Sequence, residues 1–408
     1  MMVRTMALVV IGILALVAMP AVGMAAEDEG ELVFKQNCQL CHTAERVQAK
    51  QLTRAEWQKI IDRMVGLGCP IRTSKKKQQV VLDYLVRTQG PVAGATVASV
   101  APTTPAASAP AYTGPAAKAY VVNEESQDVW AIDVTTHQVL AKAKVGKLPH
   151  GITPSPDGKV LYVTNMGSNN ITVINTQTYA TMTMSATGLN PHACVVTPNG
   201  RYLYVSNPSS NDVTVHDMQT HQAVATIAVG KFPHGVEIGP DGKRVYVANM
   251  DASDISVIDT ATNSLVETIP TAAGPHRIAV SPDGKLLYVV NADANRLSII
   301  DAEHGNEVKS VVVGMDPEDV VVAAGGAVIW VANAGSQSVE ALDAKTGAVI
   351  GIVPVAGGPH GLALTPDGKE LWIVAIDANA VVIVDTAQRK IVATVPVGQR
   401  PHLVVITP

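Results

Sequence analysis

The sequence has little charge and few aromatic residues. Of its 408 residues, 16% are charged, 4% are aromatic and four are cysteine. The formal net charge is -5, so no basic excess favours a nucleic-acid ligand. After residue 19 no apolar run approaches the ~20 residues that a membrane span needs. The sequence also lacks a serine-triad signature, a phosphate-binding loop and a cysteine-rich zinc pattern, so motifs give no support for those site types.

The longest apolar run lies at the N-terminus and is typical of a secretory signal peptide. A short basic end at residues 1–4 precedes the apolar residues 6–19, and small residues then lead to cleavage after Ala25 or Ala26. The alternative is an uncleaved membrane anchor, for which this run is short. We therefore predict that residues 1–26 are removed on export and that the mature protein is periplasmic, with no membrane span.

A haem-attachment motif follows the signal peptide directly. Cys38 and Cys41 lie three residues apart and His42 follows, which is the C-x-x-C-H pattern. The two thiols add to the two vinyl groups of haem, and the adjacent histidine becomes an axial iron ligand. A thioredoxin-like redox pair would not require the histidine. The motif predicts one covalent haem c, attached through Cys38 and Cys41 with His42 as an axial ligand.

The second axial ligand must come from elsewhere in the helical segment around this motif. Met64 lies seven residues after Trp57 on a predicted helix over residues 54–66, and therefore on the same face. A thioether ligand raises the potential and closes the iron site, which suits electron transfer. Cys69 is the rival ligand, and Met64 as an ordinary core residue is the alternative. We predict that Met64 is the distal ligand.

These motifs resemble a small class I-type cytochrome c. The resemblance covers residues 27–90 and rests on the C-x-x-C-H motif, Trp57, Met64 and the Asp83-Tyr84-Leu85 segment. It implies a small all-α haem domain that exchanges single electrons with a redox partner protein. Residues 91–117 contain no charged residue and are rich in Ala and Pro, which predicts a linker to a second domain.

The second domain, residues 118–408, is built from a repeat of 42 residues. A proline is followed by one acidic or imidazole residue at seven equally spaced positions: His150, His192, His234, His276, Glu318, His360 and His402. Tyr-Val-Thr-Asn at 162–165 and Pro-Asp-Gly at 156–158 recur with the same spacing. Four short strands in each unit of about 40 residues are typical of a propeller blade. The fold class is thus multidomain: a small all-α cytochrome c domain plus an all-β seven-bladed β-propeller.

The ends of the repeat array predict how the propeller closes. The array begins with a second strand at residues 119–122 and ends with an innermost strand at residues 402–407. The last strand should therefore complete the blade that residues 118–146 begin, which removes the free edges of an open sheet.

The repeated Tyr-Val-Thr-Asn and Pro-Asp-Gly segments resemble the YVTN family of β-propellers over residues 118–408. This resemblance specifies a fold and says little about chemistry. A cytochrome c domain joined to a propeller also resembles the cytochrome cd-type nitrite reductases, whose propeller holds a d-type haem through histidines. Those propellers have eight blades and this array has seven, which argues against nitrite reduction.

Equivalent positions in a propeller lie on a ring around its axis, so six imidazoles and Glu318 are expected around the channel mouth. Neutral imidazole suits copper, iron and zinc. The arrangement resembles nitrous oxide reductase and thiocyanate dehydrogenase, which place histidine-bound copper on a seven-bladed axis. These seven residues are therefore a candidate second site, for copper or a second haem. In the alternative interpretation, the histidines are inherited repeat residues that bond to the next blade and do not converge.

Three functions follow from the sequence. The first is a periplasmic c-type haem protein that transfers single electrons to or from a site or partner organised by the propeller. The second is an oxidoreductase with a metal or second haem on the histidine ring and a small-molecule substrate. The third is an interaction scaffold with a haem relay. The sequence assigns no catalytic residue among them.

Overall fold

The computed structural model describes residues 117–186 and 188–407. The predicted signal peptide (1–26), cytochrome c domain (27–90) and nearly all of the predicted linker (91–117) lie outside these residues. The four predicted haem-binding residues, Cys38, Cys41, His42 and Met64, lie outside them as well. Among the described residues, no helix is long and apolar enough to cross a membrane.

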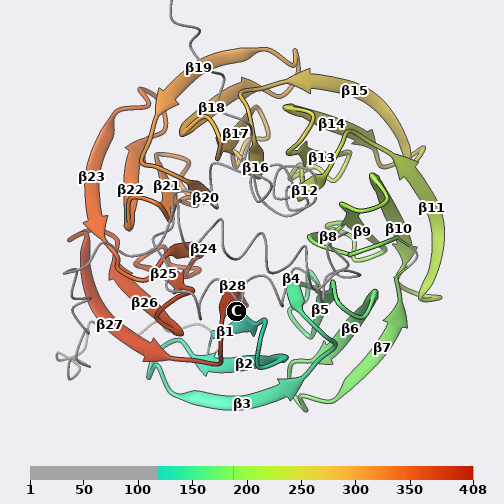
Figure 1. Cartoon of the computed structure of the whole chain (residues 1–408), viewed down its shortest axis with the longest axis horizontal. Coiled ribbons are helices and arrows are strands. Elements are labelled where there is room, and N and C mark those ends of the chain that lie inside the picture. Colours follow the sequence, from blue (N-terminus) through green and yellow to red (C-terminus); the bar gives the residue numbers. More distant parts are fainter. Residues whose placement is uncertain (1–116, 187, 408) are drawn as a thin grey trace, which may run out of the picture. The chain divides into compact units, whose positions relative to one another are not determined.

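The described chain forms seven four-stranded antiparallel sheets around one axis, as the repeat predicts (Figure 1). The innermost strands are β4 (Pro149–Pro154), β8 (Cys194–Val196), β12 (Pro233–Ile238), β16 (Pro275–Val280), β20 (Pro317–Val322), β24 (Pro359–Leu364) and β28 (Pro401–Thr407). The second strands are β1 (Lys118–Asn123), β5 (Val160–Asn165), β9 (Tyr202–Asn207), β13 (Arg244–Asn249), β17 (Leu286–Asn291), β21 (Val328–Asn333) and β25 (Glu370–Ala375).

The outer half of each blade repeats with the same order. The third strands are β2 (Asp128–Asp133), β6 (Asn170–Asn175), β10 (Asp212–Asp217), β14 (Asp254–Asp259), β18 (Arg296–Asp301), β22 (Ser338–Asp343) and β26 (Ala380–Asp385). The outermost strands are β3 (Val139–Lys144), β7 (Thr181–Ser185), β11 (Gln222–Ala228), β15 (Ser264–Pro270), β19 (Glu307–Val312), β23 (Val349–Pro354) and β27 (Lys390–Pro396).

The propeller closes through a blade built from both ends of the repeat array. Strand β28 pairs with β1, with Lys118 opposite Thr407 and Val121 opposite Val404, in the sheet order β28-β1-β2-β3. The C-terminus accordingly lies beside β1 in Figure 1. This confirms the predicted closure. The ring is held shut by the same ladder of hydrogen bonds that builds each other blade.

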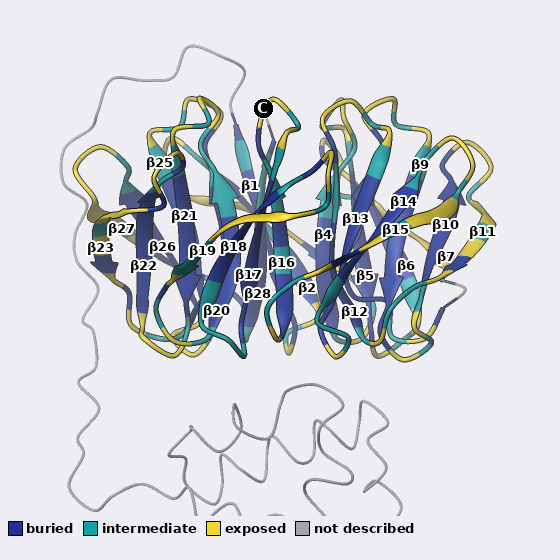
Figure 2. Cartoon of the chain, turned by 90° about the horizontal axis from the view of Figure 1, so that it is seen from above, coloured by how far each residue is buried: buried dark blue, intermediate teal, exposed yellow. Residues whose placement is uncertain are grey.

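The apolar core lies between neighbouring blades. One cluster joins Tyr204 and Val215 of one blade to Val236 and Val247 of the next. The second strands are buried on both faces, whereas the outermost strands are mainly exposed, as Figure 2 shows in yellow. Burial on both faces explains the nearly continuous Val and Ile runs of the inner strands.

The asparagine that ends most second strands is buried and hydrogen-bonded. In one blade the Asn165 amide Nδ2 donates to Asn170 Oδ1 at 2.8 Å and to Thr172 Oγ1 at 2.9 Å. Asn207 makes the same contacts with Asp212 and Thr214. This residue therefore ties the second strand to the hairpin that follows it, which accounts for its recurrence in the sequence.

Candidate functional site

A repeated turn places one side chain of each blade at the axis. Two residues before each of the seven positions the backbone is left-handed, with φ between 50° and 71°, and a proline follows. The left-handed residues are Leu148, Asn190, Phe232, Gly274, Asp316, Gly358 and Arg400. Left-handed backbone costs about 1–3 kcal/mol for a residue other than glycine. Its use in every blade shows how strongly the surrounding structure fixes this turn.

The seven side chains converge, and we call them the axial ring: His150, His192, His234, His276, Glu318, His360 and His402. All seven are buried. Neighbouring imidazole centroids are 3.6 Å apart for His150 and His192 and 3.6 Å apart for His150 and His402. Across Glu318, the centroids of His276 and His360 are 5.9 Å apart. The seven side chains are therefore close together in the folded propeller.

Half of the imidazoles also bond to the next blade. The Nδ1 atom of His192 lies 3.3 Å from the carbonyl oxygen of His234, and Nδ1 of His234 lies 3.1 Å from that of His276. His276 Nδ1 lies 2.7 Å from the carbonyl oxygen of Glu318. Because a carbonyl only accepts, Nδ1 carries the proton in each contact. In the neutral ring, Nε2 then bears the lone pair that a metal ion needs.

Burial disfavours the charged form of four imidazoles of the axial ring. The pKa values of His150, His192, His234 and His402 lie well below their ordinary value of 6.5. Loss of hydration is the main cause, because burial disfavours the charged imidazolium. Neighbouring histidines and the Arg277 guanidinium lower these pKa values further.

Glu318 sits between two imidazoles. Its Oε2 atom is 3.1 Å from His276 Nε2 and 3.3 Å from His360 Nε2. One donor atom from each of these residues lies within 4.8 Å of the others. Two ligand atoms held about 2.1 Å from one ion at angles of 90° to 109° are about 3.0–3.4 Å apart. Both separations from Glu318 match the edge of a metal coordination sphere.

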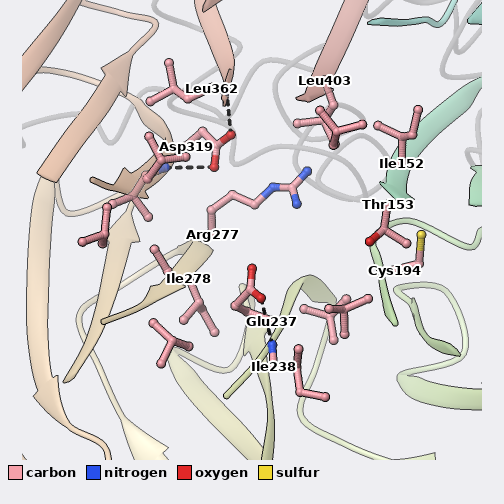
Figure 3. Close-up of a pocket in the computed structure, with 18 of the residues that line it drawn as sticks. Ile152, Thr153, Cys194, Glu237, Ile238, Arg277, Ile278, Asp319, Leu362 and Leu403 are labelled. Atoms are coloured by element: carbon pink, nitrogen blue, oxygen red, sulfur yellow. Dashed lines mark hydrogen bonds between the residues drawn. The ribbon is translucent and has the colours of Figure 1, made fainter. Parts of the chain in front are cut away.

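A cavity of about 440 Å³ follows the axial ring along the channel (Figure 3). Its walls are formed by residues that come one to six positions after the ring residues, and most of them are aliphatic. Three charged residues also line it: Glu237, Arg277 and Asp319. The sequence analysis did not single out these three. The repeat could have indicated two of them, because Arg277 and Asp319 occupy a position that is Gly or Ala in four other blades.

Burial raises the pKa of Glu237 from 4.5 to about 7. Between these values the unfolded chain loses a proton that the folded chain keeps, so the free energy of unfolding falls as the pH rises. At about 1.4 kcal/mol per pH unit, the free energy of unfolding falls by about 3 kcal/mol by pH 8. Glu237→Gln should therefore be more stable than wild type at pH 8 and show little difference at pH 4.5. Urea unfolding followed by circular dichroism at the two pH values measures this.

The exposed Glu307 provides the matched control for that experiment. Glu307→Gln removes a carboxylate without removing a buried charge, so its stability relative to wild type should not change with pH. An equal pH dependence in the two variants would contradict the assignment of the effect to burial of Glu237.

The remaining histidines and cysteine of the described chain lie away from the axial ring. His137, His221 and His304 lie in outer turns and His216 lies in β10. Cys194 is buried in β8, and burial raises the pKa of its thiol to about 12. A thiol with so high a pKa is unreactive at neutral pH.

Comparisons with known families match two parts of the propeller. A family model described as the cytochrome D1 heme domain matches residues 156–278. A model described as a YNCE-like beta-propeller matches residues 237–328 and 322–407. No curated protein matches the chain. The propeller is therefore similar to haem-associated propellers over part of its length.

Solved structures agree on the fold. The chain is 29% identical to a chain of Kuenenia stuttgartiensis hydrazine synthase, with a TM-score of 0.59, covering 63% of this chain and 89% of that one. A protein of unknown function from Desulfotomaculum acetoxidans is 15% identical with a TM-score of 0.64, covering 71% and 98%. A 6-phosphogluconolactonase-like protein from Bacteroides uniformis is 17% identical with a TM-score of 0.63, covering 72% and 100%. The last two show the fold alone.

The D1 match implies a d-type haem, and the axial ring does not fit one between its members. Neighbouring imidazoles from His360 through His402 and His150 to His276 have centroids only 3.6–4.1 Å apart. Side chains in such contact leave no slot for a planar macrocycle. The donor atoms of His276, Glu318 and His360, by contrast, are close enough together to suit a single ion.

Proposed function

We propose that this chain is an exported redox protein whose propeller holds one transition-metal ion through His276, Glu318 and His360. The observation that carries the proposal is the position of the Glu318 carboxylate between two imidazole Nε2 atoms. The bond from His276 Nδ1 to a carbonyl leaves the lone pair of a neutral ring at Nε2. The Nε2 lone pair of His276 and the Glu318 Oε2 atom, 3.1 Å apart, repel each other unless a metal ion or a proton lies between them.

The donor set favours a first-row transition metal. Two imidazoles with one carboxylate suit iron, copper and zinc, and the two-histidine, one-carboxylate set with open positions is typical of non-haem iron. The second coordination layer is also in place at His276, because its Nδ1 is fixed by the carbonyl oxygen of Glu318. Such outer contacts orient a ligating imidazole and fix its tautomer. The adjoining cavity provides room for a small-molecule substrate beside the ion.

The electron carrier in this proposal is the predicted haem domain at residues 27–90. Cys38 and Cys41 attach the haem, and His42 and Met64 ligate its iron. A haem with two protein ligands has no open iron site and supplies single-electron transfer when bound. The chain would then exchange electrons between an external redox protein and the propeller ion.

The comparisons support a redox setting. The chain is similar to the cytochrome D1 heme domain model over residues 156–278. Its 29% identity to a chain of hydrazine synthase spans 89% of that chain. Haem of the c type is attached in the periplasm, and the predicted signal peptide at residues 1–26 supports export to that compartment.

Metal analysis of the full-length protein, matured in a haem-attaching periplasm without chelator, tests the proposal. We expect one haem iron and one further transition-metal ion for each chain. Glu318→Gln and His360→Ala should lose the further ion, by at least about tenfold in affinity, and keep the haem. N-terminal sequencing of the periplasmic fraction should give Ala26 or Glu27 as the first residue.

His304→Ala provides the control, because this imidazole is exposed in an outer turn and should leave both metals in place. One haem iron and no further metal would overturn the metal site and leave a haem relay with a docking propeller. Absence of haem absorption would overturn the cytochrome domain independently of the propeller.

A further inference from the structure

Arg277 is a half-buried cation, and two of its guanidinium nitrogens have no hydrogen-bond partner in the described part of the chain. Its side chain projects into the cavity beyond the axial ring, with Asp319 and Glu237 on the same walls (Figure 3). The Nε and Nη2 atoms are shielded from solvent, and neither makes a hydrogen bond within the described chain. Guanidinium stays charged at all accessible pH values. Shielding these two N–H groups without an acceptor carries a free-energy penalty that a ligand would remove.

The neighbouring carboxylates attract Arg277 electrostatically, but their hydrogen bonds go to backbone amides. Asp319 accepts hydrogen bonds from the backbone amides of Val320 and Leu362, both at 2.9 Å. Glu237 Oε1 accepts from the amide of Ile238 at 3.0 Å. Among residues 117–186 and 188–407, no ion pair within 4.0 Å includes Arg277. Within the described part of the chain, these carboxylates therefore leave the Nε and Nη2 edge of the guanidinium without an acceptor.

The repeat shows that no structural role requires an arginine here. The residue after each ring position is Gly151, Ala193, Gly235, Arg277, Asp319, Gly361 and Leu403. Five of the other six blades keep this position small or apolar and fold in the same way. The long cationic side chain is thus particular to one blade and directed into the shared cavity.

The two unpartnered atoms define the geometry of the ligand. Nε and Nη2 lie on one edge of the guanidinium and donate two parallel N–H groups. Such an edge matches two oxygens of a carboxylate or of a planar inorganic oxyanion. The cavity of about 440 Å³ limits the ligand to a small molecule.

We propose that Arg277 binds a small planar oxyanion, an organic carboxylate or its inorganic counterpart, inside the axial cavity through Nε and Nη2. The site follows directly on His276 in the chain but uses no member of the axial ring. It therefore stands whether or not the ring holds a metal ion.

Calorimetric titration of the full-length protein with formate, with bicarbonate and with sulfate, at constant ionic strength, tests this site. Formate or bicarbonate should bind saturably with one site for each chain, and the tighter of the two identifies an organic or an inorganic source. Arg277→Gln should weaken binding by about ten- to a hundredfold. Arg277→Lys keeps the charge and loses the fork, and should also bind at least about tenfold more weakly.

Arg201→Gln is the matched control, since Arg201 lies at the surface in an ion pair with Asp217, and it should bind like wild type. Circular dichroism shows whether each variant is folded, and the wild-type titration stands alone if Arg277→Gln is not. Absence of saturable binding to wild type would overturn the proposal, as would equal binding by Arg277→Gln. Binding of sulfate in preference to both planar anions would overturn the assigned ligand class.

Discussion

Deleting residues 401–408, which include β28, is expected to abolish cooperative folding of the propeller. The deletion leaves β1 without its inner neighbour and opens the only blade that joins the two ends of the repeat array. Leu403 and Val404 are 6% and 2% exposed, and burying two such side chains contributes about 3–6 kcal/mol. With the lost ladder, this approaches the whole net stability of about 5–15 kcal/mol of a folded protein. Urea unfolding and limited proteolysis measure the loss.

Adding the deleted strand back as a separate peptide tests whether loss of this strand causes the instability. A peptide of residues 400–408 supplies the same ladder and the same apolar side chains, so it should restore protease resistance in a concentration-dependent manner. A peptide with Leu403 and Val404 replaced by serine should not. A truncated protein with an unchanged unfolding midpoint would show that closure through β28 is dispensable.

Acidification below pH 6.5 is expected to destabilise the metal-free propeller steeply. The pKa values of His150, His192, His234 and His402 are lowered in the folded state, chiefly by burial. Below 6.5 the unfolded chain therefore binds protons that the folded chain does not, and the free energy of unfolding falls as the pH falls. Four such groups give a slope of up to roughly 5 kcal/mol per pH unit. Above pH 7.5 this contribution should be constant.

Unfolding midpoints in urea between pH 8 and 5, in the presence of a chelator, measure the slope. His192→Gln removes one buried imidazole and should reduce the slope by about a quarter. His304→Gln removes an exposed imidazole and should leave the slope near that of wild type. A flat profile through pH 6 would mean that the imidazoles of the axial ring accept protons without loss of the fold.

The sequence predicted the propeller in detail because the repeat is regular. A constant spacing of 42 residues fixed the number of blades, and the positions of the first and last strands fixed their closure. The Asp-Gly turn and the strand-ending asparagine are local signals that each blade repeats independently. These features depend on near neighbours in the chain, which is why they can be read without coordinates.

The site was harder to predict, because it depends on the direction of side chains from different blades. Placement on a ring did not establish that imidazoles meet, since each could have turned toward the neighbouring blade. Each ring residue follows a turn with a left-handed residue before the proline. Three of the seven left-handed residues, Leu148, Phe232 and Arg400, are unusual types for that backbone, so the turn could not be predicted from them. Arg277 was not predicted from the sequence, because nothing in its immediate neighbours shows that this arginine lines a cavity.

In the proposed metal site, the one carboxylate of the axial ring would also set how many ions a chain can hold. Seven identical blades would provide seven equivalent places and no preference among them. Replacing histidine by Glu318 in one blade makes a single pair of neighbours, His276 and His360, different from every other pair. A propeller of seven similar blades would thus bind one ion per chain, because one blade differs from the other six.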